Sequence, residues 1–220
     1  MIRTLLFSLF LSAFCATQVQ AQYFGRNKPR YNKEKFKVTE TQHFVIYDYL
    51  DNPDKLKEIA AAAEVWYSMH KAVLRDSFTE KNPLIIYSDH AGFQQTTAIQ
   101  GDVSVGTGGV TEGLRNRVIF PIAVSNQQTH HVLGHEMVHA FQYHMIINGD
   151  STSLRNLANI PLWMVEGLAE YLSIGRIDAH TALWMRDAVL NDDVPTIDQL
   201  NNPKYFPYRY GHAFWSFLTG

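Results

Sequence analysis

Two histidines four residues apart constrain this chain more than any other feature. They belong to the segment HEMVH, His135 to His139, which follows a capping box at Ser125 to Gln128 that predicts a helix of about twenty residues. A spacing of four on a helix puts both imidazoles on one face, where they can bind one metal ion. Glu136 lies about 100° around the helix from His135, which suits a base beside a metal-bound water rather than a third ligand.

A third ligand is expected from a second helix, which opens at Pro161 and runs through Ile174. This helix is apolar but carries Glu166 and Glu170 on one face, and glutamate is almost never buried without a partner. Glu166 as a metal ligand, with Glu170 accepting the N–H of a ligand histidine, would satisfy both carboxylates. Two exposed carboxylates on an amphipathic helix remain the alternative. Three further histidines are expected to be structural or supporting rather than ligating: His130, His131 and His144.

The order of the expected elements indicates an α+β fold, because segments typical of strands come first and helices follow. We expect strands at 43–50, 83–87 and 117–123, with Pro121 at a sheet edge or a strand end. The glycine-rich segment 101–113 lacks the Gly-Lys-Ser/Thr of a phosphate-binding loop, so we expect a hairpin or an irregular sheet edge there. Besides the two helices above, we expect helices at three places: from Pro53 along an apolar stripe to Val73, at 179–190 and at 208–219.

The first residues, 1–21, are expected to be a signal peptide. Arg3 supplies a positive start, and the apolar run from Leu5 to Phe14 is too short to span a bilayer. Cleavage after Ala21 would give an exported, periplasmic or secreted protein without cysteine, because the only cysteine is Cys15. The alternative to a cleaved signal peptide is lipidation at Cys15. For the basic leader, 22–40, we expect a solvated segment, and the alternative is contact with an anionic membrane.

Composition limits the classes of partner. The chain has 220 residues, 46% of them apolar, and a formal net charge of −2. This balance suits a globular domain, placed at 41–220, and offers no basic face for nucleic acid. We expect no transmembrane span in the mature chain and a peptide or protein as the substrate.

Two motifs together resemble those of the gluzincin metallopeptidases, the group of thermolysin and the neutral aminopeptidases. They are HEMVH and, on the second helix, W-x-x-E-G-x-A-E-Y from Trp163 to Tyr171. The resemblance implies a zincin-like fold: a small N-terminal mixed sheet, an active-site helix and a mostly helical C-terminal part. It implies Zn2+ bound by His135, His139 and Glu166, with Glu136 as general base and Glu170 as the supporting carboxylate. Gluzincins commonly stabilise the oxyanion with a tyrosine or histidine from a later helix, and Tyr210 is the candidate here.

A wider stretch also resembles the N-terminal region of exported bacterial TolB-like β-propeller proteins. The segments that carry this resemblance are QYFGRNKP, PLWMVEGLAEYLSIGR and YRYGHAFW. It implies that the domain is truncated at its C-terminus, with a β-propeller following and possible envelope protein partners. Three hypotheses stay open: an exported zinc peptidase, a non-catalytic zinc-stabilised binding or scaffold module, and a zinc-free domain with a chance motif. Retention of Glu136 favours the peptidase, because a structural zinc site needs no base.

Overall fold

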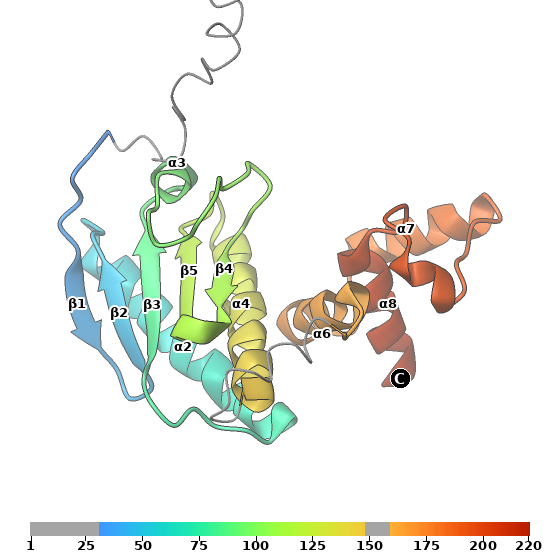
Figure 1. Cartoon of the computed structure of the whole chain (residues 1–220), viewed down its shortest axis with the longest axis horizontal. Coiled ribbons are helices and arrows are strands. Elements are labelled where there is room, and N and C mark those ends of the chain that lie inside the picture. The colour runs from blue at the N-terminus through green and yellow to red at the C-terminus, as the bar shows by residue number, and fades with distance from the viewer. Residues whose placement is uncertain (1–30, 148–158) are drawn as a thin grey trace, which may run out of the picture.

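The computed structural model describes residues 31–147 and 159–220. A mixed sheet of five strands has the order β1-β2-β3-β5-β4, in which β2, β3 and β5 are parallel and the edge strands β1 and β4 are antiparallel to their neighbours (Figure 1). The strand bounds are β1 Lys37–Glu40, β2 Phe44–Asp48, β3 Asn82–Tyr87, β4 Val110–Glu112 and β5 Arg117–Pro121.

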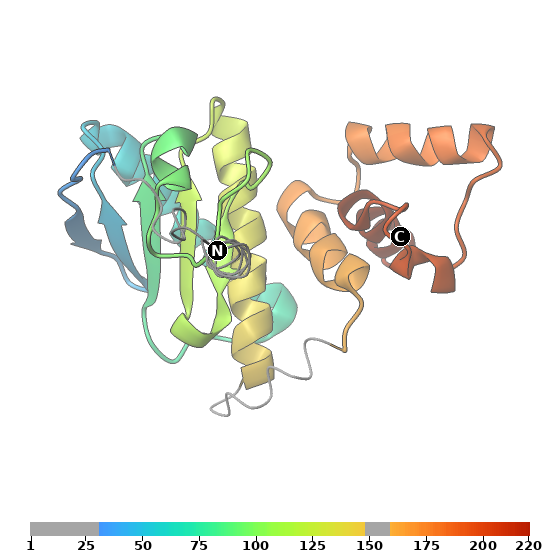
Figure 2. The same cartoon turned by 45° about the horizontal axis from the view of Figure 1, so that its top comes forward.

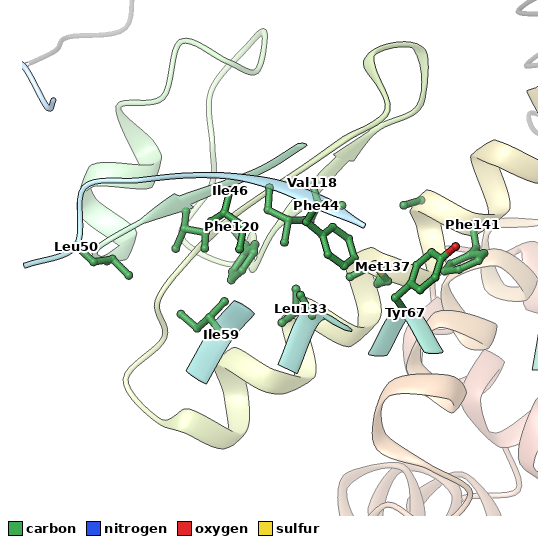
Figure 3. Close-up of a cluster of buried hydrophobic side chains, with 14 residues drawn as sticks. Phe44, Ile46, Leu50, Ile59, Tyr67, Val118, Phe120, Leu133, Met137 and Phe141 are labelled. Atoms are coloured by element: carbon green, nitrogen blue, oxygen red, sulfur yellow. The ribbon is translucent and has the colours of Figure 1, made fainter. Parts of the chain in front are cut away.

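Two long helices, α2 (Pro53–Leu74) and α4 (Asn126–Ile147), cover one face of the sheet. The core lies between them and the strands: Phe44, Ile46 and Phe120 point from the sheet toward Ile59 of α2 and Leu133 of α4 (Figure 3). Burying these apolar side chains is the main driving force for this arrangement. We call the sheet together with α2 and α4 the sheet lobe.

Local chemistry sets where α2 begins and ends. The Asn52 side chain accepts hydrogen bonds from the backbone N–H groups of Asp54 and Lys55, and Pro53 occupies the first turn, where its missing N–H costs nothing. Arg75 closes the helix in the left-handed conformation, with φ 56°. A shorter helix, α3 (His90–Gln94), lies against the opposite face of the sheet, where Tyr87, Phe93 and Ile119 form a second, smaller core.

Three further helices form a second unit beside α4, which we call the helical lobe (Figure 2). They are α6 (Leu162–Ile174), α7 (Ala179–Leu190) and α8 (Pro207–Leu218), and the 3-10 turn Asp198–Asn201 precedes α8. Helix α6 contacts α4 on one side and α8 on the other. Helices α6 and α8 cross at two glycines: a Cβ on Gly211 would lie 2.0 Å from the carbonyl oxygen of Trp163, and one on Gly167 would lie 2.3 Å from Gly211.

The α+β prediction is confirmed, with a small mixed sheet followed by helices. All three expected strands are present, and Pro121 ends β5 at a strand end rather than at a sheet edge. The glycine-rich segment leads into the edge strand β4, as expected. The leader boundary was wrong: Phe36 packs against Tyr49 and Tyr87, and Lys37–Glu40 form β1, so the folded domain begins before residue 41.

The signal peptide, the first part of the basic leader (22–30) and the expected helix end near Asn148-Gly149 lie outside the described residues. Within the described ranges, no helix is both long enough and apolar enough to cross a membrane.

Candidate metal centre

Three donor atoms, from one buried and two partly buried side chains, meet at the contact between α4 and α6. His135 Nε2 and His139 Nε2 lie 3.1 Å apart, and each lies 3.2 Å from Glu166 Oε2. Ligands held tetrahedrally at 2.0–2.1 Å from a zinc ion are separated by about 3.3 Å. The triangle of donors therefore has nearly the dimensions that a single ion requires. The structure brings together the three residues that the sequence predicted as ligands.

Hydrogen bonding fixes which ring nitrogens face one another. His139 Nδ1 lies 2.7 Å from Gln142 Oε1, and the Gln142 amide donates to the Val165 carbonyl at 3.1 Å, so Nδ1 of His139 carries the proton. His135 Nδ1 lies 3.2 Å from Glu170 Oε1, within ion-pair distance although not aligned as a hydrogen bond. The lone pair of His139 Nε2 then points toward His135 Nε2 and Glu166 Oε2, and three polar atoms this close are stabilised by a shared proton or by a bound cation.

The electrostatics of the group agree with this stabilisation by positive charge. Burial disfavours the charged ring of His135, but Glu166 and Glu170 outweigh burial and raise its pKa above the usual range. Burial likewise disfavours the charged carboxylate of Glu166, but His135 and His139 outweigh it and lower its pKa. The carboxylates thus give the site a negative potential. Positive charge, from protons or from a metal ion, would stabilise it.

Glu136 lies beside the donors and is not one of them. Strand β4 holds it: Thr111 Oγ1 lies 2.7 Å from Glu136 Oε2 and 2.9 Å from its backbone oxygen. Gly109 gives it room, because a Cβ there would lie 2.8 Å from Glu136 Cγ. The side chain is almost buried, with 7% of the residue exposed, so its orientation is set by these neighbours. The sequence predicted the role of Glu136 but not the contribution of Gly109 and Thr111.

A cleft of about 720 Å3 opens over the donors. Strand β4 forms one wall, α4 and α6 form the floor, and the start of α8 contributes Tyr208. The ring of Tyr208 stacks on that of His135, with centroids 5.8 Å apart and an interplanar angle of 20°. Burial and the nearby carboxylates of Glu166 and Glu136 raise the pKa of Tyr208, so its hydroxyl stays protonated and can donate a hydrogen bond.

Tyr210, the tyrosine expected from the sequence, does not line this cleft. It packs inside the helical lobe, in ring contact with Tyr205 and Trp184. Residues two apart on a helix point about 200° away from each other, so only one of the two tyrosines can face α4. The rotation of α8 is set by Gly211, three residues after Tyr208, which lies on the face of α8 that approaches α6 closely.

Glu170 is the centre of a buried polar network that links the two lobes. Its Oε1 lies 3.2 Å from both His135 Nδ1 and His131 Nε2, and its Oε2 lies 3.2 Å from the Arg209 guanidinium. Arg209 also pairs with Asp178 at 3.2 Å. His131, His135 and Glu170 form a second cluster of potential ligand atoms. However, if His135 binds metal through Nε2 its Nδ1 carries a proton, so this cluster orients the ligand instead.

The remaining histidines lie where the sequence placed them, outside the donor triangle. His130 pairs with Glu58 of α2 at 3.0 Å, and His144 pairs with Asp76 at 2.7 Å. Gln142 and Arg209 are further supporting residues that the sequence did not indicate. The partners of Arg209 and the Val165 partner of Gln142 are distant along the chain, whereas the other partner of Gln142, His139, is three residues away on the same helix.

Comparison with protein-family models, with curated proteins and with solved structures found no match to this chain. The case for a function therefore depends on the geometry of the site.

Proposed function

We propose that this chain is an exported zinc-dependent peptidase with a zincin-like fold. The observation that carries the proposal is the triangle of His135, His139 and Glu166 donors with Glu136 held beside it at the floor of an open cleft. A structural zinc site is closed by four protein ligands, whereas a catalytic one has three and leaves a position for water. Among the described residues three donors converge here, and the cleft occupies the remaining side.

Each residue around the cleft has a role in the proposed reaction. A zinc ion at this position would lower the pKa of its bound water to about 7 and polarise the substrate carbonyl. Glu136 accepts the proton of that water and delivers it to the leaving amine. Thr111 fixes the carboxylate of Glu136 for this transfer. Tyr208 donates its O–H to the carbonyl oxygen as that oxygen gains negative charge.

The edge strand β4 suits an extended peptide. It pairs with β5 on one side only, and Gly109, Val110 and Thr111 line the cleft. A substrate added as a further strand would form main-chain hydrogen bonds along this edge, which position the bond to be cleaved near Glu136. Export itself is proposed from the sequence of residues 1–21.

The test compares wild-type protein with Glu136→Gln, both loaded with zinc, on a random peptide library read by mass spectrometry. We expect wild type to cleave a defined set of peptides, and Glu136→Gln to bind one zinc ion and lose cleavage. Equal cleavage by both proteins would contradict the assignment of the base. Zinc binding by both without any cleavage would support the alternative, a zinc-stabilised binding or scaffold module.

A further inference from the structure

Two half-exposed aromatic rings follow Tyr208, at the margin of the cleft, in a chain of ring contacts. The ring of Phe206 lies 5.1 Å from that of Tyr208, and the ring of Trp184 lies 5.6 Å from that of Phe206, both measured between centroids. Phe206 is 42% exposed and Trp184 is 41% exposed. We call the pair Trp184 and Phe206 the aromatic platform. It joins α7 to the start of α8 and adjoins the proposed catalytic cleft through the ring contact of Phe206 with Tyr208, which lines that cleft.

The platform is not the interior of the helical lobe. That interior is formed by Trp163, Leu200 and Tyr205, each at most 9% exposed. Two large rings in contact with each other and left at two fifths exposure retain apolar surface that a ligand could cover favourably. The planes of the two rings are tilted by 33° to each other. Their exposed faces offer a surface on which an aromatic or aliphatic side chain packs well.

The charge of the cleft supports an apolar ligand. Among the described residues that line it, the acidic side chains, Glu136 and Glu166, belong to the metal centre, and none is a lysine or arginine. These residues offer a peptide main-chain hydrogen bonds and apolar contacts. An apolar side chain reaching the platform would add selectivity without any charged partner.

We propose that Trp184 and Phe206 form a subsite for an aromatic or large aliphatic side chain of the peptide substrate, about three residues from the bond that is cleaved. The two centroid distances place the Trp184 ring no more than about 11 Å from the Tyr208 ring, and an extended chain that advances about 3.3 Å per residue covers that distance in about three residues. This inference deepens the proposed function and rests on it. It assigns these rings to substrate selection, whereas the chemistry belongs to the metal centre.

The test uses octapeptides with blocked ends, built around a bond that the library shows to be cleaved. The outer positions are alanine, and in each peptide of the series a single phenylalanine replaces one of these alanines. We expect wild type to show about a fivefold to tenfold higher kcat/KM for phenylalanine at one position two to four residues from the bond. In Trp184→Ala and Phe206→Ala the ratio of kcat/KM for the phenylalanine peptide to kcat/KM for the all-alanine peptide should fall to about one, whatever the variant's rate on the all-alanine peptide. Phe217→Ala, which removes an 87% exposed ring at the far end of α8, should retain the wild-type ratio.

A binding measurement separates failure of this inference from failure of the proposed function. In zinc-loaded Glu136→Gln, titration with the best phenylalanine peptide should change tryptophan fluorescence, and the further change Trp184→Ala should abolish that signal and weaken binding. If wild type cleaves no peptide the proposed function fails, and the same titration, run with an octapeptide that carries one central phenylalanine among alanines, decides the subsite by itself. Three results would each overturn the subsite. They are an unchanged preference for phenylalanine in both alanine variants, peptide binding that is independent of Trp184, and a wild-type dimer that Trp184→Ala converts to monomer.

Discussion

The sheet lobe and the helical lobe contribute opposite halves of the candidate site, and they are built differently. The sheet lobe buries a continuous cluster of fourteen residues, and its helix α4 carries His135, Glu136 and His139 between the core residues Leu133 and Phe141. The helical lobe supplies Glu166, Glu170, Tyr208 and Arg209, but its core cluster has only three fully buried members. It also leaves large apolar residues of α7 exposed, such as Leu183 and Leu190.

This difference indicates how the site is held. The two histidines are fixed by close packing of α4 against the sheet, which resists displacement. Glu166 is fixed by the contact of α6 with α4, and that contact includes polar bridges: the Gln142 amide to the Val165 carbonyl, and Glu170 to His131 and His135. A bound metal ion would be one more bridge between the lobes. Loss of metal should therefore loosen the helical lobe more than the sheet lobe.

The largest effect is expected from the tyrosine that the helical lobe brings to the cleft. Tyr208→Phe removes the hydroxyl that we assign to the developing oxyanion, and loss of one such donor lowers kcat by about 100-fold or more. Tyr210→Phe is the matched control, because Tyr210 packs in the lobe interior and should leave kcat within about twofold of wild type. Steady-state kinetics on one cleavable peptide would check this. A larger loss with Tyr210→Phe would reverse the assignment.

The packing of the helical lobe can be disrupted without touching the sheet lobe. Gly211→Ala would place a Cβ 2.0 Å from the Trp163 carbonyl oxygen, so α8 must move away from α6. We expect about 3 kcal/mol of destabilisation confined to this lobe. Hydrogen exchange should accelerate in α6 and α8 and remain unchanged in α2. Gly106→Ala is the control, since its Cβ would meet only Ser104 Oγ at 4.0 Å. Equal acceleration in α2 would mean that the lobes unfold as one unit.

The sheet lobe has its own sensitivity to acid. Burial lowers the pKa of His70 to about 4, although its Nε2–H donates to the Gly134 carbonyl at 3.0 Å. The unfolded chain binds a proton near pH 6.5 and the folded chain does not, so stability is lost as the pH falls from 6.5 toward 4. Between pH 7 and 5, metal-free wild type should lose about 2 kcal/mol more unfolding free energy than His70→Gln in urea titrations. Parallel pH profiles would contradict a neutral, buried His70.

A smaller effect is expected at the bridge between α4 and α6. Gln142→Ala removes both the acceptor for His139 Nδ1–H and the donor to Val165. Loss of such an orienting partner should weaken zinc binding by about tenfold, which a competition titration with a chromophoric chelator measures. Gln127→Ala, an exposed position on the same helix, should leave the zinc affinity unchanged. Equal affinity in both variants would mean that packing alone orients His139.

The sequence was sufficient for features that depend on local periodicity. A spacing of four determined that His135 and His139 share a face, and the same spacing determined that Glu166 and Glu170 do. Features that depend on contacts between distant segments could not be predicted. The choice between Tyr208 and Tyr210 depends on the rotation of α8, which the close approach of Gly211 to α6 sets. The edge strand β1 was missed for a similar reason, because a short, largely exposed strand is defined by its pairing with β2 rather than by its own sequence.

The central claim is that donors from both lobes bind one metal ion. The most direct measurement is the zinc content of purified protein after dialysis against a buffer of fixed free zinc, for wild type, His139→Ala, Glu166→Ala and Glu170→Ala. We expect one zinc ion per wild-type chain, none in His139→Ala or Glu166→Ala, and partial or full occupancy in Glu170→Ala because Glu170 orients a ligand without binding metal. One zinc ion per chain in Glu166→Ala, under conditions that just saturate wild type, would contradict the claim.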